Sequence, residues 1–248
     1  MSHFLYQQMI LDHSKNPCGK TDNPKGDCCK ANNPSCGDKI HMCVTLKDGI
    51  IEEMSYDVSG CSISIAAASV LVATMKGQSV ETFHEVMGQY LKMLKDGSDV
   101  DIPAKLQVFS GVSQYPMRVK CATFVWHAAK EAIQIASYPI QMTQAARDFW
   151  HSLVMAQQGQ GIHLVFKQVG CMGWQFIPSV VTQAPEGGQI MRFGRLVVFM
   201  LPEDIKLVEG TKIDYMQHDD LGQSKVVYQH PNATLHCGCG ESFFMGEI

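Results

Sequence analysis

Ten cysteines are the residues of this chain whose type and spacing could do chemistry. They occur at positions 18, 28, 29, 36, 43, 61, 121, 171, 237 and 239 of 248 residues. In a reducing compartment, cysteines at organised spacing indicate metal or sulfur chemistry rather than disulfides. Two groups of three carry most of this signal.

The first group consists of Cys36, Cys61 and Cys121, with Asp38 close to the first of them. Cys61 is predicted to begin a helix, where free N–H groups and the helix dipole stabilise a thiolate. Cys121 follows Arg118 by three positions in a helical pattern, so the guanidinium is expected to share its face and favour the thiolate. Three thiolates and one carboxylate would complete a tetrahedral zinc site. Spacing alone leaves open the alternative that these are unrelated buried cysteines.

The second group consists of Cys171, Cys237 and Cys239, each with a neighbouring glycine. Glycine permits positive φ, so two cysteines only two positions apart can turn toward one metal. Three thiolates leave a tetrahedral site one ligand short, and the fourth is expected from a second subunit, a small thiol or Glu241. An open position also suits a cluster that is handed on. The alternative is a surface dithiol near the end of the chain.

Four cysteines remain outside these groups, namely Cys18, Cys28, Cys29 and Cys43. We interpret them as structural or incidental. Cys28 and Cys29 fall in a polar stretch, so they are expected to lie on a loop, where they could form a reactive surface pair.

The elements that must position the first group are a mixture of helices and strands. The polar stretch 16–38, rich in Asn, Pro, Gly and Lys, is predicted to be a loop. Alternation on both sides of Asp48-Gly49 predicts a β-hairpin. Helices are predicted over about 4–13, 61–77, 80–95 and 118–136, and the hairpin strands over 40–46 and 50–58.

A second unit is predicted to begin near Pro139. Thr143 is a good N-cap for one leading helix, and from Ile162 onward the apolar period is two, which is typical of strands. The expected fold is an α+β N-terminal domain, with a small antiparallel sheet packed by helices, followed by a mostly-β domain. The expected boundaries are 1–138 and 140–248.

Composition argues against nucleic-acid and membrane partners. The net charge is −4, and no run of like charge suggests a phosphate-binding surface. The longest apolar stretch, 63–75, is shorter than the roughly 20 residues that a bilayer requires. The first residues do not resemble a signal peptide, so a soluble, cytoplasmic protein is expected.

Four motifs in the first half resemble the SufU/IscU-type scaffold and sulfur-acceptor proteins of iron–sulfur cluster assembly. They occur in the family's order, at Tyr6–His13, Asn33–Ile40, Gly60–Ser64 and Arg118–Trp126. Lys120 stands where IscU-type proteins have a histidine, which favours the SufU branch.

This resemblance implies a ligand set and a partner. The implied ligands of zinc or an iron–sulfur cluster are Cys36, Asp38, Cys61 and Cys121. Cys36, on an exposed loop, is implied to accept a persulfide from a cysteine desulfurase.

Residues 141–248 resemble the A-type carriers, the IscA/SufA/HesB-like family. The matching segments are Met142–Ala146, Lys167–Gly173, Leu207–Tyr215, Pro231–Ala233 and Cys237–Phe243. The resemblance implies a compact β fold that binds iron, or a 2Fe–2S or 4Fe–4S cluster, through the second cysteine group. It also implies a homo-oligomer formed through this domain.

Two histidines lie close to the second group in sequence. His230 replaces an expected Asn and is a candidate for a conditional extra ligand. His236, beside Cys237, is interpreted as a supporting or surface residue rather than a ligand.

These observations favour an iron–sulfur cluster assembly protein that accepts sulfur from a desulfurase and assembles or relays clusters to apo iron–sulfur proteins. Such a protein would act as a scaffold and carrier. The sequence does not decide whether it also has sulfurtransferase activity. The first alternative is a zinc-dependent sulfurtransferase partner of a desulfurase, with a separate iron-binding tail domain. The second is a thiol redox sensor that uses Cys28-Cys29 or Cys237 with Cys239 and no metal.

Overall fold

The structure is a computed structural model, and it describes residues 3–169, 173–217, 224–236 and 242–245. The chain divides into two compact units, Met1–Ser137 and Tyr138–Ile248, and each is described by itself. Among the described helices, none has the length and apolar character needed to cross a bilayer.

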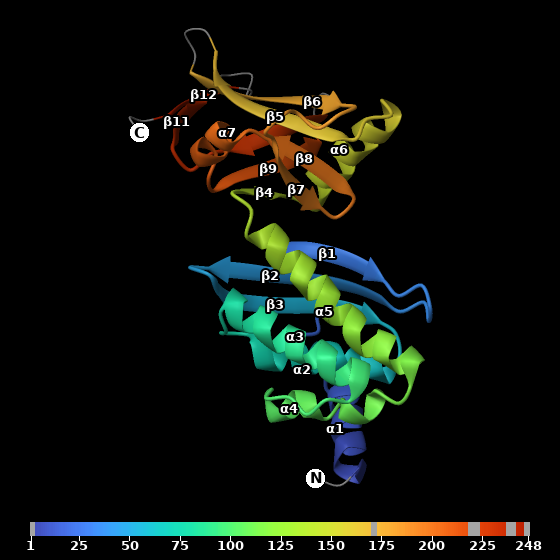
Figure 1. Cartoon of the computed structure of the whole chain (residues 1–248). Coiled ribbons are helices and arrows are strands. Elements are labelled where there is room, and N and C mark those ends of the chain that lie inside the picture. Colours follow the sequence, from blue (N-terminus) through green and yellow to red (C-terminus); the bar gives the residue numbers. More distant parts are fainter. Residues whose placement is uncertain (1–2, 170–172, 218–223, 237–241, 246–248) are drawn as a thin grey trace. The chain divides into compact units, whose positions relative to one another are not determined.

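The sheet of the first unit has three antiparallel strands in the order β1-β2-β3, seen in Figure 1. They are β1 (Asp27–Asn32), β2 (Lys39–Lys47) and β3 (Ile50–Ser59). The predicted hairpin is confirmed in β2 and β3, whereas the prediction that 16–38 is entirely loop is wrong. Its second half forms β1, which pairs with β2 along its full length. Pairing and the burial of Cys29 outweigh the polar composition of this strand.

Helices cover one face of this sheet. They are α1 (His3–Lys15), α2 (Ser62–Met75), α3 (Val80–Asp96), the short α4 (Ala104–Gln107) and α5 (Pro116–Ala136), with a 3₁₀ turn at Ser110–Val112. The longest, α5, packs across β1 and β2, and α2 packs against β3 and α5. Figure 1 shows α5 crossing the sheet. The predicted helices are confirmed. The start of α2 and the second turn of α5 lie close to the loop between β1 and β2.

Aromatic side chains fix how these helices pack. Trp126 of α5 stacks on Tyr90 of α3, with ring centroids 4.9 Å apart. Phe83 and Phe109 contact the same pair, and all four side chains are fully buried. Aromatic pairs of this kind add about 0.5–1.5 kcal/mol each beyond the area that they bury, so α3 and α5 are held firmly together.

The second unit is mostly strands, as expected. A six-stranded sheet has the order β11-β12-β6-β5-β8-β7, and a three-stranded sheet has the order β10-β9-β4. The strands are β4 (Ile140–Met142), β5 (Gly161–Gln168), β6 (Trp174–Val181), β7 (Gln189–Phe193), β8 (Leu196–Met200), β9 (Thr211–Gln217), β10 (Ser224–Gln229), β11 (Ala233–His236) and β12 (Ser242–Met245).

Two helices complete this unit, α6 (Gln144–Ala156) and α7 (Pro202–Leu207). The predicted N-cap is confirmed, since the Thr143 hydroxyl accepts a hydrogen bond from the Ala146 N–H at 3.3 Å. The buried Trp150 anchors α6, which packs against β9, β5 and β8. The expected fold class, an α+β unit followed by a mostly-β unit, is confirmed.

Candidate metal and sulfur centre

A tight turn between β1 and β2 presents Cys36 to solvent. Asn33 organises this turn, because its carbonyl accepts from the Gly37 N–H at 2.8 Å and its side-chain oxygen accepts from the Ser35 N–H at 3.1 Å. Gly37 has φ of +78°, a conformation that glycine adopts without strain. The turn thus leaves Cys36 exposed and returns the chain to Asp38 at the start of β2.

Asp38 is buried beside the start of α2. Its carboxylate accepts hydrogen bonds from the Ser64 hydroxyl and from the Cys61 backbone N–H, the latter at 3.3 Å. Burial acts to raise the pKa of Asp38, but the hydrogen bonds from Ser64, Cys36 and Cys61 outweigh burial and hold the pKa below its ordinary value. The carboxyl group is therefore ionised and able to act as a ligand.

The two other predicted thiols come from the helices. Cys61 is the N-cap residue of α2 and is exposed, with its Sγ 3.4 Å from Ser64 Oγ. Cys121 lies in the interior of α5 and is buried, with its Sγ 3.6 Å from that of Cys36. The Asn33 side-chain amide also donates toward the Cys121 sulfur at 3.9 Å. The turn, the helix start and the helix interior therefore meet at one place.

The Cys121 thiol has a strongly perturbed acidity. Burial, followed by the neighbouring Cys36 and Cys61, raises the pKa of Cys121 to about 12. The Arg118 guanidinium lies over the Tyr115 ring at 4.7 Å, and Arg118 lines the same cavity as Cys121, so its effect on the thiolate stays a prediction. A bound cation is what would compensate the charge of this buried thiolate.

The donor atoms fit a soft cation. Donor atoms of Cys36, Asp38 and Cys121 all lie within 4.8 Å of one another, and Cys61 contacts Asp38 through its backbone. Thiolates select zinc and iron–sulfur clusters over hard cations, and a carboxylate is an acceptable zinc ligand. That these residues bind a metal stays a prediction. The types of donor atom and the distances among Cys36, Asp38 and Cys121 are compatible with that prediction.

A cavity of about 600 Å³ opens beside the three cysteines. Apolar side chains form much of its wall, including Ile10, Leu11, Tyr115 and Met117. Leu11, Tyr115 and Met117 are each about half exposed. A protein partner that reaches Cys36 would therefore meet an apolar surface around the thiol.

The second predicted group lies outside the described residues. This applies to Cys171, Cys237, Cys239 and Glu241. The described segments that flank them lie on neighbouring strands, because Trp174 at the start of β6 pairs with Phe243 of β12. Stacked rings surround this pair, with Phe166 and Trp174 centroids 5.0 Å apart.

His230 is not available as an extra ligand, which corrects the sequence-based expectation. Its Nδ1 accepts from the Asn232 N–H at 3.1 Å, and its Nε2 lies 2.7 Å from the Leu207 carbonyl oxygen. The ring is buried and stacks against Phe166 and Phe243. Both nitrogens are thus occupied, so the side chain has a structural role in this fold. The His236 side chain is not among those described.

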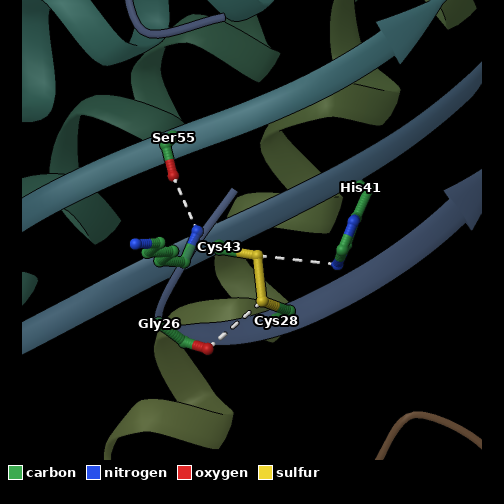
Figure 2. Close-up of a disulfide and its surroundings, with 6 residues drawn as sticks. Gly26, Cys28, His41, Cys43 and Ser55 are labelled. Carbon is green, nitrogen blue, oxygen red and sulfur yellow. Dashed lines mark hydrogen bonds between the residues drawn. A yellow bond between two sulfur atoms is a disulfide. The ribbon is translucent and has the colours of Figure 1, made fainter. Parts of the chain in front are cut away.

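The interpretation of Cys28 and Cys29 as a surface pair on a loop is also wrong. Both lie in β1, where adjacent side chains point to opposite faces of the sheet. Cys28 forms a disulfide with Cys43, its cross-strand partner on β2, as Figure 2 shows. Cys29 is buried in the core, and Cys18 is exposed. Once β1 is recognised as a strand, the register alone places Cys28 opposite Cys43.

Three thiols and a carboxylate gathered at one end of the sheet, in an α+β unit, are the donor set of a domain that handles metal or sulfur. The model of the NifU-like N-terminal domain family matches residues 5–122. The zinc-dependent sulfurtransferase SufU of Bacillus subtilis is 35% identical over 131 residues, which cover 52% of this chain and 89% of that protein.

Two further proteins are similar to parts of this chain. Protein HesB of Nostoc is 32% identical over 88 residues, which cover 36% of this chain and 70% of that protein. A crystal structure of a nitrogen-fixing NifU-like protein (N-terminal) from Brucella abortus has a TM-score of 0.50 at 19% identity, covering 54% of this chain and 96% of that chain. This last similarity shows the fold alone. The chain therefore belongs to the NifU-like, SufU/IscU family through its first half and to the HesB-like family through the rest, as in a fusion.

Proposed function

We propose that this chain is an iron–sulfur cluster assembly protein that accepts sulfur from a cysteine desulfurase and assembles or relays clusters to apoproteins. The observation that carries the proposal is the convergence of the exposed Cys36, the ionised Asp38 and the buried Cys121 within 4.8 Å. Membership in the NifU-like, SufU/IscU family and in the HesB-like family supports it.

Cys36 is the group that would receive sulfur. Its thiolate attacks the terminal sulfur of a persulfide on the desulfurase, a new S–S bond forms on Cys36, and the desulfurase thiolate leaves. The exposed turn gives a partner access to Cys36, and the apolar wall formed by Leu11, Tyr115 and Met117 offers that partner a surface to bury.

Zinc is the ion that the first centre would hold between sulfur deliveries. The ligands proposed are Cys36, Asp38, Cys61 and Cys121, and bound zinc would keep their sulfur atoms as thiolates. Asp38 is already ionised, and Ser64 orients its carboxylate. The same donors also suit an iron–sulfur cluster, which would be cargo rather than a permanent part of the protein.

The HesB-like part would carry the cluster. Iron or a cluster is proposed to bind through Cys171, Cys237 and Cys239, and a second subunit would supply the missing ligand. The proposed homo-oligomer would therefore form through the second domain. The proposed domains are 1–138 for sulfur acceptance and 140–248 for carriage.

The second candidate is a zinc-dependent sulfurtransferase partner of a desulfurase that carries no cluster on its first domain. The similarity to SufU of Bacillus subtilis favours it, together with Lys120, whose ammonium donates to Ser35 of the Cys36 turn at 3.1 Å. Zinc has no visible absorption, whereas iron–sulfur clusters absorb visible light.

The test is anaerobic purification of three full-length proteins, with zinc, iron and acid-labile sulfide counted in each. They are the parent chain, a Cys36→Ser/Cys121→Ser variant and a Cys171→Ser/Cys237→Ser/Cys239→Ser variant. All three proteins are incubated with a desulfurase, cysteine and ferrous iron before the count. The proposal expects iron and sulfide in the triple variant, which keeps only the first centre, and less of both in the Cys36→Ser/Cys121→Ser variant than in the parent chain. Zinc without iron or sulfide in the triple variant would support the second candidate instead.

A further inference from the structure

A third group of cysteine and histidine side chains lies on the opposite face of the same sheet, where Cys28 and Cys43 form a disulfide. In β2, Ile40, Met42 and Val44 point into the core beneath the helices. The alternating residues His41 and Cys43 therefore point to the other face. The cluster thus lies away from the core side of the sheet.

The register of β1 and β2 brings a third donor to the same place. Cys28 pairs with Cys43, so its sulfur lies on the face that also carries His41. The His41 Nε2 atom is 3.6 Å from Cys43 Sγ. Figure 2 shows the His41 ring directed toward the disulfide, with a dashed line for this contact. Donor atoms of Cys28, His41 and Cys43 all lie within 4.8 Å of one another.

The surroundings shield these side chains from solvent. Cys43 is fully buried, and Cys28 and His41 are half-buried. The segment before β1 crosses this face, because the Lys25 N–H donates to Ser55 of β3 at 3.3 Å.

We propose that Cys28, Cys43 and His41 form a second zinc site when the disulfide is reduced, and that oxidation of the two cysteines releases the ion. Two thiolates and an imidazole are a donor set that zinc prefers. Three protein ligands leave one position for water or a small ligand. The site uses none of the residues proposed to accept sulfur.

The redox step balances with a low-molecular-weight disulfide as the oxidant. The two zinc-bound thiolates give up two electrons in total and form the Cys28–Cys43 bond. The S–S bond of the oxidant breaks, its two halves leave as thiolates, and zinc departs as Zn²⁺. A dithiol reverses the reaction and restores the ligands.

Zinc counting on the reduced full-length chain tests the proposal. Four proteins are reduced anaerobically, loaded with zinc and desalted: the parent chain, Cys18→Ser, Cys28→Ser/Cys43→Ser and His41→Ala. Cys18→Ser is the matched control, because Cys18 is an exposed free cysteine outside the cluster. The parent chain and Cys18→Ser are expected to hold about one more zinc ion per chain than Cys28→Ser/Cys43→Ser. His41→Ala is expected to lose that ion to a chelator that the parent chain resists.

Two further measurements show whether the additional zinc ion is separate from the first centre and whether oxidation releases it. A Cys36→Ser/Cys121→Ser variant is expected to retain the additional zinc ion, which separates it from the first centre. Oxidised glutathione is expected to release that ion in step with the loss of two thiols. Equal zinc content in the reduced parent chain and Cys28→Ser/Cys43→Ser, both folded by circular dichroism, overturns the proposal. Should the double variant not fold, unchanged zinc retention in His41→Ala overturns it.

Discussion

The sulfur atoms of Cys36 and Cys121 lie 3.6 Å apart although 85 positions separate the two residues in the chain. Cys36 is exposed on a turn, and Cys121 is buried in α5. One thiol of the pair can thus be reached by a partner protein, while the other is sheltered. This asymmetry is what a centre needs if it must receive sulfur from outside and also hold an ion inside.

Ser64 is expected to support metal binding without being a ligand. Its hydroxyl donates to the Asp38 carboxylate and contacts Cys61 Sγ at 3.4 Å. Loss of such an orienting partner typically lowers metal affinity about 10–100-fold. We expect Ser64→Ala to weaken zinc binding by this factor in a competition titration with a chromogenic chelator. Ser62→Ala, on the same first turn of α2, is the control, and equal affinities in both variants would contradict the role of Ser64.

Gly60 is expected to be required because it lies directly against the Asp38 carboxylate. A Cβ atom at Gly60 would lie 2.6 Å from Asp38 Cγ, which forces the carboxylate to move. We expect Gly60→Ala to lower zinc affinity more than Ser64→Ala does, since it displaces a ligand rather than its partner. Isothermal titration of the zinc-free protein measures this effect.

The matched control for that variant is Gly88→Ala in the middle of α3, where an added Cβ meets nothing within 4 Å. It is expected to leave zinc affinity unchanged and to raise the free energy of unfolding by roughly 0.5–1 kcal/mol. A Gly60→Ala protein with the parent's zinc affinity would mean that Asp38 is not a ligand.

Local patterns were sufficient to predict the long elements of the first unit but not β1. The helices at α2, α3 and α5 have long apolar stretches, and Asp48-Gly49 marks the hairpin turn. The strand β1 is polar on one face and six residues long, so its existence depends on β2 lying beside it. The Cys28–Cys43 disulfide was missed for the same reason.

The candidate site was predicted through family motifs rather than through spacing. Cys36, Cys61 and Cys121 are too far apart in sequence for a local rule to join them, and only tertiary packing does so. The supporting contacts could not be predicted in this way. The place of Arg118 over Tyr115 and the close approach of Gly60 to Asp38 depend on how α5 and α2 meet the sheet.

The zinc-free protein is expected to lose stability at alkaline pH because of Cys121. Its pKa is raised from 9.0 to about 12 by burial and by Cys36 and Cys61. A group with a raised folded-state pKa stabilises the fold below its unfolded pKa and loses that contribution as pH rises. The free energy of unfolding in urea should therefore fall between about pH 9 and pH 12.

Replacement of the thiol tests this explanation. Cys121→Ala is expected to show a flatter decline of the free energy of unfolding over the same pH range, because it has no proton to lose. Cys18→Ala, which removes an exposed thiol, should decline as the parent chain does. Parallel declines in the parent chain and Cys121→Ala would show that another group causes the alkaline loss.

His230 is expected to stabilise the second unit without binding metal. Its ring bridges the Leu207 carbonyl and the Asn232 N–H, and it stacks against Phe166 and Phe243. His230→Ala leaves the Leu207 carbonyl and the Asn232 N–H without their partner and removes a buried ring, and the loss of such hydrogen bonds typically costs about 0.5–1.5 kcal/mol each. We expect a lower Tm for the second unit and an iron content per folded chain equal to that of the parent. His151→Ala, on α6, is the control for histidine removal, and a selective loss of iron in His230→Ala at unchanged Tm would restore His230 as a ligand.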